Sequence, residues 1–156
     1  MSEESEFLRQ VPFFAEMEPS RLRLLAFVSD RVAFDAGRRL FAQGEPADAA
    51  YLIMKGCAEI ILETAEGGPV LLATVGAHEF VGEMGILCDM PRTATVRAKK
   101  PLIALRISKD VFERMVQACP EMALSIMRTL TRRLDAMNRQ VSNANLEHSQ
   151  TGEARQ

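Results

Sequence analysis

Hydrophobic residues follow two different spacings along this chain, and the changes between them divide it into three parts. Near the N-terminus an apolar set interrupted by Pro12 predicts a short helix between Glu6 and Phe14. Pro19 then stands at the start of a second predicted helix, because proline suits the first helical turn. The apolar residues behind it lie at helical spacing: Leu22, Leu24, Leu25 and Val28. Two helices are therefore expected within residues 1–28.

Between Arg31 and Leu105 the pattern changes to short segments rich in Val, Ile, Leu, Phe and Thr, separated by Gly and Pro. Such segments are typical of β-strands bounded by turns. They are 32–34, 39–42, 50–54, 58–62, 70–75, 94–98 and 102–105. Many short strands at close spacing predict a double-sheet roll or barrel, which we place at residues 31–107.

A helical pattern returns after Ser108, which can cap a helix that continues to Cys119. Pro120 marks a break, and from Glu121 to Asn143 there is no Gly or Pro. Apolar residues there recur with spacings of 4, 3, 4, 3 and 4: Ala123, Met127, Leu130, Leu134, Met137 and Val141. This heptad seam either covers the roll or pairs with a second copy. We expect a homodimer through Met127, Leu130, Leu134, Met137 and Val141.

Composition restricts the class of protein. The chain has 156 residues, of which 47% are hydrophobic and 26% charged, and a formal net charge of -2, so it shows no overall attraction to nucleic acid or anionic membrane. No apolar run approaches the ~20 residues that span a bilayer, and the N-terminus is acidic. We expect a cytoplasmic protein without direct DNA binding. Three scattered cysteines and two distant histidines predict no metal site.

The candidate chemistry lies between Gly76 and Ala98. Gly82 lets backbone approach a ligand, and the residues after it suit one helical turn whose free N–H groups attract a phosphate. Arg92 offers a planar fork for phosphate oxygens, and Thr93 adds a hydroxyl. Glu83 would be repelled by a phosphate, so it is expected to accept hydrogen bonds from a sugar. These residues predict a pocket for one phosphate and one ribose, as in a cyclic nucleotide.

The segments 82–87 (Gly-Glu-Met-Gly-Ile-Leu) and 91–96 (Pro-Arg-Thr-Ala-Thr-Val) resemble the phosphate-binding cassette of the cyclic-nucleotide-binding domain family, which includes catabolite activator proteins and kinase A regulatory subunits. The resemblance implies an α+β fold: a double-stranded β-helix or jelly-roll of about eight strands, flanked by N-terminal helices and a long C-terminal helix. It assigns ligand contacts to Gly82, Glu83, Met84, Gly85, Arg92 and Thr93. Where the family's long helix faces the base, this chain has Met137 and Asn138, and only Asn138 can hydrogen-bond a purine.

The resemblance also implies a function and an organisation. Residues 1–144 would form a cyclic-nucleotide-binding domain, with helices at 1–28, the roll at 31–107, the cassette at 80–95 and helices at 108–144, followed by a disordered tail at 145–156. No helix-turn-helix, membrane or kinase segment is recognisable, so a stand-alone domain is expected. The ligand would be cAMP first, with cGMP open because of Thr93.

Ligand binding would move the long helix about a hinge at Cys119-Pro120, with Met84 and Leu87 shifting against that helix, and signal to an unknown effector protein. The main alternative is a nucleotide-independent interaction scaffold with a vestigial pocket. A related pocket for another small anion is a third possibility. An enzyme is not expected, because neither a nucleophile–base pair nor a set of metal ligands is visible.

Overall fold

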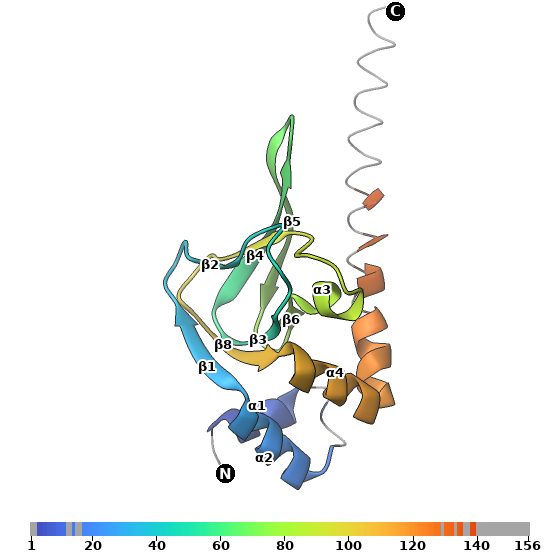
Figure 1. Ribbon diagram of the computed structural model, residues 1–156. Coiled ribbons are helices and arrows are strands. Elements are labelled where there is room, and N and C mark those ends of the chain that lie inside the picture. Colours follow the sequence, from blue (N-terminus) through green and yellow to red (C-terminus); the bar gives the residue numbers. More distant parts are fainter. Residues whose placement is uncertain are drawn as a thin grey trace, which may run out of the picture.

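Two antiparallel sheets of four strands each form the body of the molecule, and helices lie below and to the right of them in Figure 1. The computed structural model describes residues 3–11, 14, 17–128, 130–132, 134–135 and 138–139. One sheet has the order β1-β8-β3-β6 and the other β2-β7-β4-β5. The strands are β1 Asp30–Phe34, β2 Arg39–Phe41, β3 Ala49–Lys55, β4 Cys57–Thr64, β5 Gly68–Gly76, β6 Phe80–Val81, β7 Thr95–Ala98 and β8 Leu102–Ser108. The expected β-roll of about eight strands with flanking helices is confirmed.

Strand β3 shows why the roll has two cores. Its residues from Ala49 to Met54 are all buried, because side chains on alternate positions pack into different clusters. One face contributes to the inner cluster, which fills the space between the two sheets. The inner cluster consists of Leu40, Phe41, Ala49, Tyr51, Ile53, Ala58, Val75, Val81, Val96, Ala98, Leu102 and Ala104.

The other face of β3 contributes to the helix-side cluster, which joins the first sheet to the helices. It consists of Leu8, Val11, Phe14, Leu22, Leu25, Ala50, Leu52, Met54, Phe80, Ile86, Leu105, Ile107, Phe112, Met115, Met122 and Ile126. Phe80 lies at its centre, with edge-on contacts to Phe14 at 6.3 Å and Phe112 at 5.7 Å between ring centroids. All helices of the described chain thus share one core.

The N-terminal helices differ in part from the sequence prediction. Helix α1 runs over Glu3–Gln10, so it begins and ends earlier than the expected segment from Glu6 to Phe14. Its early start has a physical reason, since Arg31 Nη1 donates to Glu3 at 3.0 Å and to Glu4 at 3.3 Å. Helix α2, Pro19–Val28, has proline in its first turn as predicted.

The C-terminal helices follow the predicted break. Helix α4, Lys109–Ala118, ends before Cys119, and a new helix begins at Pro120 and is helical through residue 128 and at the later described positions. We call it the C-terminal helix. The predicted side-chain cap from Ser108 is wrong: Ser108 is the N-cap residue, but its hydroxyl makes no capping hydrogen bond.

Two further differences in what the sequence predicts concern a very short strand and the C-terminal tail. Strand β6, Phe80–Val81, was not predicted, because two residues are too few for a periodic signal. The predicted disordered tail at 145–156, together with Met137 and Val141, lies outside the described residues. Within the described residues, no helix combines the length and apolar character needed to cross a lipid bilayer.

Candidate functional site

The turn between β6 and α3 is built around Gly82, whose φ of 84° is in the left-handed region that favours glycine. A Cβ atom on Gly82 would lie 2.5 Å from Nη1 of Arg92 and 3.0 Å from the ring of Phe41. Helix α3, Glu83–Leu87, follows directly, so its first N–H groups emerge at this turn. The absence of a side chain at Gly82 is what lets Arg92 and the turn meet.

Gly85 serves the same turn by a different contact. A Cβ atom there would lie 2.5 Å from Cβ of Ala47 and 2.9 Å from the carbonyl oxygen of Met90. The carbonyl oxygen of Gly85 also accepts the backbone N–H of Met90 at 2.9 Å. Gly85 therefore allows α3 to pack closely against the segment that precedes β3.

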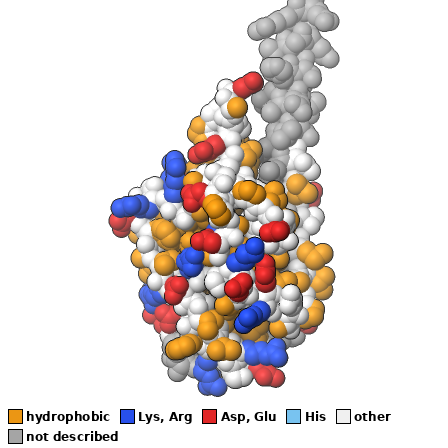
Figure 2. All heavy atoms as spheres, in the orientation of Figure 1, with side chains coloured by type: hydrophobic (Ala, Val, Ile, Leu, Met, Phe, Trp, Pro, Cys, Tyr) orange, Lys and Arg blue, Asp and Glu red, His pale blue; other side chains and the backbone are white. Residues whose placement is uncertain are grey.

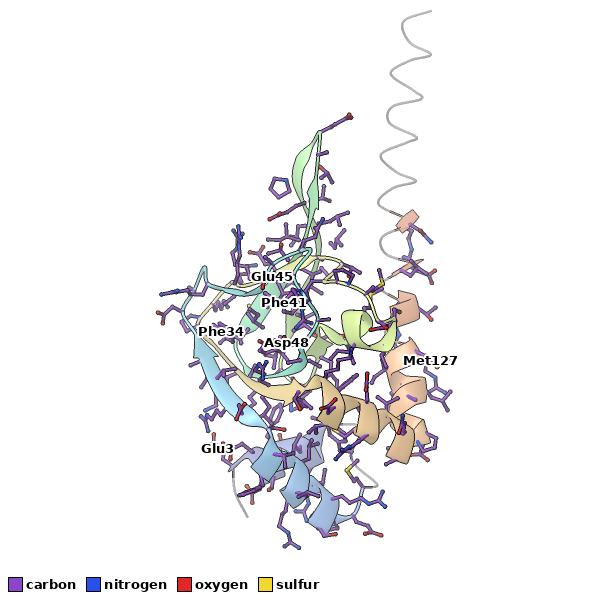
Figure 3. The ribbon with its side chains drawn as sticks, viewed as in Figure 1. Glu3, Phe34, Phe41, Glu45, Asp48 and Met127 are labelled. Carbon is purple, nitrogen blue, oxygen red and sulfur yellow. The ribbon has the colours of Figure 1, made fainter. Side chains whose placement is uncertain are left out.

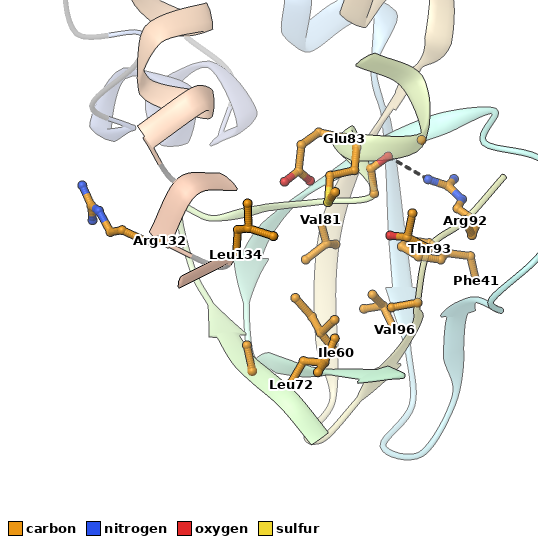
Figure 4. A pocket seen from close by; sticks show the side chains of 15 residues that line it. Phe41, Ile60, Leu72, Val81, Glu83, Arg92, Thr93, Val96, Arg132 and Leu134 are labelled. Atoms are coloured by element: carbon orange, nitrogen blue, oxygen red, sulfur yellow. Dashed lines mark hydrogen bonds between the residues drawn. The ribbon is translucent and has the colours of Figure 1, made fainter. Parts of the chain in front are cut away.

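Arg92 is buried, with only 4% of its surface exposed, and its guanidinium is held from three sides. Nη1 donates to the carbonyl oxygen of Gly82 at 2.9 Å, which Figure 4 draws as a dashed line. Nη2 donates to the carbonyl oxygen of Ala49 at 2.8 Å and to Oδ1 of Asp48 at 3.3 Å. The Nε atom is buried and has no hydrogen-bond partner within the described part of the chain. The Nε–H is therefore an unsatisfied buried donor within the described chain.

The charge of Arg92 is only partly compensated. Burial lowers the pKa of its guanidinium below the ordinary value, and the nearby Asp48 carboxylate offsets part of that shift. Asp48 is 66% exposed and also accepts a bond from Arg106 at 3.0 Å, so one carboxylate serves two arginines. An arginine stays protonated at neutral pH, so the site keeps a positive charge that an anion would neutralise.

The segment between β2 and β3 fixes the backbone of Arg92. The N–H of Gly44 donates to the carbonyl oxygen of Arg92 at 2.9 Å. The N–H of Arg92 donates to the carbonyl oxygen of Glu45 at 2.8 Å. Figure 3 shows Glu45 and Asp48 on this segment and Phe41 at the end of β2, directly before it. Arg92 is thus bound by main chain and side chain to one short stretch of the roll.

Glu83 is the second buried charged residue of the site. It stands in the first turn of α3, and only 2% of its surface is exposed. A carboxylate at a helix N-terminus is stabilised by the helix dipole. Its buried place beside the cavity suits an acceptor of hydrogen bonds from sugar hydroxyls better than a partner for a phosphate.

A cavity of about 410 Å³ opens beside these residues (Figure 4). Its wall away from the cassette is apolar, because Ile60 is paired across the sheet with Val96 on one side and Ala73 on the other. Leu134 and Arg132 of the C-terminal helix also line the cavity. The volume lies in the range of small-molecule sites, and an apolar space with a few charged groups at one end suits a flat, apolar group that carries a phosphate.

A family model for the cyclic nucleotide-binding domain matches residues 31–119, more than half of the chain. The chain belongs to this family. The resemblance drawn from residues 82–96 is confirmed, and the matched segment contains the β-roll from Arg31 onwards and helix α4.

Named relatives of this cyclic nucleotide-binding domain are regulatory proteins. The chain is 34% identical over 110 residues to a cAMP-dependent protein kinase regulatory subunit of Emericella nidulans, covering 70% of this chain and 26% of that protein. It is 30% identical over 133 residues to a CRP-like cAMP-activated global transcriptional regulator of Mycobacterium tuberculosis, covering 85% and 59%. The chain thus spans about a quarter and three fifths of the lengths of these two relatives.

A solved structure supports the fold. The sensor domain of the transcriptional regulator DNR from Pseudomonas aeruginosa superposes with a TM-score of 0.71 at 31% identity, covering 83% of this chain and 87% of that one. The cyclic nucleotide-binding fold expected from the cassette is therefore shown for this chain.

The structure brings six of the seven candidate ligand residues of this domain to the cavity wall: Gly82, Glu83, Met84, Gly85, Arg92 and Thr93. Asn138 is the exception. It is exposed and does not line the cavity. Asn138 lies four residues beyond Leu134, about 6 Å further along a helix, so its contact with a base stays a prediction.

Sequence reasoning missed the apolar wall and the groups that orient Arg92. Ile60 and Val96 could have been found, because both are apolar residues within predicted strands, and Val96 is followed by the exposed Arg97. Arg132 is exposed and also lines the cavity. Asp48 and Ala49 carry no local signal, since they meet Arg92 across 44 and 43 residues of chain.

Within the described residues, no group of three or more His, Cys, Asp or Glu side chains is arranged to hold a metal ion. Cys57, Cys88 and Cys119 are free thiols.

Proposed function

We propose that this domain binds a cyclic nucleotide in the cavity beside Arg92, with cAMP as the first candidate and cGMP as the second. The observation that carries the proposal is the buried guanidinium of Arg92, whose Nε has no partner in the described chain and which borders an apolar cavity. A phosphate would supply the missing acceptor and counter-charge. The ring atoms of the base would occupy the apolar space.

Roles follow for the other lining residues. The N–H groups after Gly82 would hold phosphate oxygens, and Glu83 would accept hydrogen bonds from the ribose. Thr93 lies at the cavity and would bond to phosphate or base, so it keeps cGMP open. We rank cAMP first because the names of both curated relatives refer to cAMP. The chain would act as a regulatory domain rather than as an enzyme.

Calorimetric titration of the purified chain with cAMP and cGMP tests this proposal. We expect micromolar or tighter binding of at least one, and a loss of roughly 10- to 150-fold in Arg92→Ala, because a hydrogen bond to a charged group is removed. Arg97→Ala is the matched control, since Arg97 is an exposed arginine five residues away. Binding of neither nucleotide would favour the interaction scaffold, or a pocket for another small anion.

We further propose that occupancy is relayed to the C-terminal helix. Ile86 of α3 is buried in the helix-side cluster together with Met115 of α4 and with Met122 and Ile126 of the C-terminal helix. This packing supports a route in which a shift of α3 displaces the helix about the break at Cys119-Pro120. Leu87 is 39% exposed, so Ile86 is a better candidate than Leu87 for the coupling residue.

Hydrogen exchange tests the relay. Ligand should change the protection of residues 120–128 in the wild type, and Arg92→Ala should abolish that change at the same ligand concentration. A relay requires the ligand-bound and ligand-free forms to differ in the C-terminal helix. A nucleotide that binds without altering the protection of residues 120–128 would therefore exclude this route.

The output surface would include a homodimer contact. Met127 is 58% exposed and Leu134 55%, whereas Leu130 packs against the helix-side cluster. The seam is therefore divided between the chain's own core and solvent, and Met127 lies on the C-terminal helix in Figure 3. Sedimentation should show a dimer that Met127→Glu disrupts and Arg128→Glu leaves intact. A monomeric wild type at tens of micromolar would contradict dimerisation.

A further inference from the structure

Helix α2 has two apolar faces, and only one of them is covered. Leu22 and Leu25 are 2% and 4% exposed and belong to the helix-side cluster. Leu24, Phe27 and Val28 are 62%, 86% and 42% exposed and follow the i, i+3, i+4 spacing of one helix face. Phe27 is more exposed than any other large hydrophobic side chain that the structure describes. We call these three residues the α2 stripe.

Arginines stand on the same face as the α2 stripe. Arg21 precedes Leu24 by three residues, and Arg23 precedes Phe27 by four, so each shares a helix face with the stripe. Both are exposed, and no carboxylate of the described chain lies within 4.0 Å of either. At the lower end of Figure 2, where Figure 1 places α2, hydrophobic side chains lie beside basic ones.

The charge of this surface indicates what would cover it. Helix α2 contains no acidic residue, and the nearest acids in the sequence, Glu18 and Asp30, lie outside its ends. A second copy pairing α2 with α2 would bring four arginines close together, which is unfavourable. Exposed aromatic and arginine side chains are the residues that contribute most to protein interfaces. A partner with carboxylates beside an apolar row complements both features.

We infer that the α2 stripe docks an acidic amphipathic helix of a partner protein. Helices pack on one another through such i, i+3, i+4 ridges. Docking itself does not depend on the proposed function; only its control by nucleotide rests on the proposed relay. The buried face of α2 shares the helix-side cluster with Ile86, Met122 and Ile126. A change at the cassette would thus reach the layer on which the partner sits.

Two synthetic helical peptides of about 18 residues, long enough to form a helix, test the docking. Both carry leucine at i, i+3, i+4 and i+7, with glutamate at the flanking positions in one and lysine in the other. Fluorescence anisotropy measures their binding to the full chain without nucleotide, so failure of the nucleotide proposal leaves this result unaffected. We expect the glutamate peptide to bind at least roughly tenfold more tightly than the lysine peptide.

Variants locate the binding surface. Phe27→Ala should weaken the glutamate peptide by roughly tenfold, because it removes the central apolar anchor, and the double change Arg21→Glu with Arg23→Glu should reverse the preference between peptides. Leu71→Ala, which truncates a 47% exposed leucine on β5, is the matched control and should have no effect. Equal affinity for the two peptides, or affinity indifferent to Phe27→Ala, would overturn the inference. Sedimentation showing self-association that Phe27→Ala removes would overturn it in favour of a second copy.

Discussion

The guanidinium of Arg92 lies over the aromatic ring of Phe41, with Cζ 4.0 Å from the ring centroid. The ring is itself held, because Phe41 is only 8% exposed and contacts Tyr51 at 6.0 Å between centroids. Gly82 leaves room for both groups on the other side. The electron-rich face of the ring stabilises a cation that burial disfavours, and it sets the plane of the fork offered to a ligand.

Replacing Phe41 tests this positioning. Phe41→Leu should weaken nucleotide binding by roughly 30-fold, since a desolvated cation–π contact contributes about 2 kcal/mol. Phe34→Leu is the control: Phe34 also contacts Tyr51, at 6.1 Å, but makes no contact of this kind with Arg92. Calorimetry should show the loss of affinity in Phe41→Leu alone, although both variants should lose stability. Equal losses of affinity would assign the effect to general loosening of the roll.

Gly82 offers a second test with a close match elsewhere in the chain. Gly82→Ala places Cβ against Arg92 and Phe41, whereas Gly37→Ala has nothing within 4 Å. The φ values are 84° and 87°, so both substitutions carry a similar backbone strain of about 1 kcal/mol. We expect Gly82→Ala to lower the unfolding free energy more than Gly37→Ala, because its Cβ also clashes with Arg92 and Phe41, and to lose more than roughly tenfold in nucleotide affinity, which Gly37→Ala should retain. Retained affinity would show that Arg92 adapts to the added methyl group.

Local features of the site were predictable from sequence, and long-range ones were not. Gly82, the helical turn after it and Arg92 lie within eleven residues, and their residue types alone indicate a phosphate site. The anchors of Arg92 come from the start of β3, and only the fold brings them there. Contacts between residues more than 40 positions apart cannot be inferred from the local pattern of one sequence.

The same distinction explains the errors in the fold. Strands β3 and β4 were predicted because seven or eight residues show a clear hydrophobic pattern, whereas β6 has two residues and depends on pairing with Tyr51 and Leu52. The early start of α1 depends on Arg31, which is 28 residues away from Glu3. The position of Asn138 relative to the cavity is likewise not encoded locally, since the phase and tilt of a helix over a cavity are tertiary properties.

The side chain of Gln43 ties the segment that holds Arg92 to the β4–β5 hairpin. Nε2 of Gln43 donates to the carbonyl oxygen of Glu63 at 3.1 Å, and the N–H of Glu63 donates to Oε1 of Gln43 at 2.8 Å. The side-chain amide of Gln43 thus makes the pair of backbone hydrogen bonds to Glu63 that a neighbouring strand would make. Gln43→Ala should destabilise the hairpin locally by about 1 to 2 kcal/mol, through loss of two hydrogen bonds.

Hydrogen exchange resolved by segment measures this effect. The amide of Glu63 and its neighbours should exchange faster in Gln43→Ala, while the amides of β3 and β8 in the core should keep their rates. Gln117→Ala, at an exposed glutamine on α4, is the control and should leave the hairpin unchanged. Unchanged exchange at Glu63 in Gln43→Ala would mean that the ladder to β5 alone holds this end of the hairpin.

The attachment of α1 to the roll should weaken in acid. The hydrogen bond from Arg31 lowers the pKa of the Glu3 carboxyl, with the charges of Arg31 and Lys55 adding to the shift. A carboxyl whose pKa is lower in the folded state contributes stability above its unfolded pKa, ~4.3, and loses it as pH falls through the folded value. Methyl NMR signals of Leu8 and Val11 should therefore keep their native positions from pH 7 to about 5 and shift below about 4. Glu3→Gln should reduce the pH dependence of these methyl signals. Glu6→Gln should leave it unchanged, because no basic side chain of the described chain lies within 4.0 Å of Glu6. A pH profile unaffected by Glu3→Gln would show that apolar packing of Leu8 and Val11 alone holds the helix.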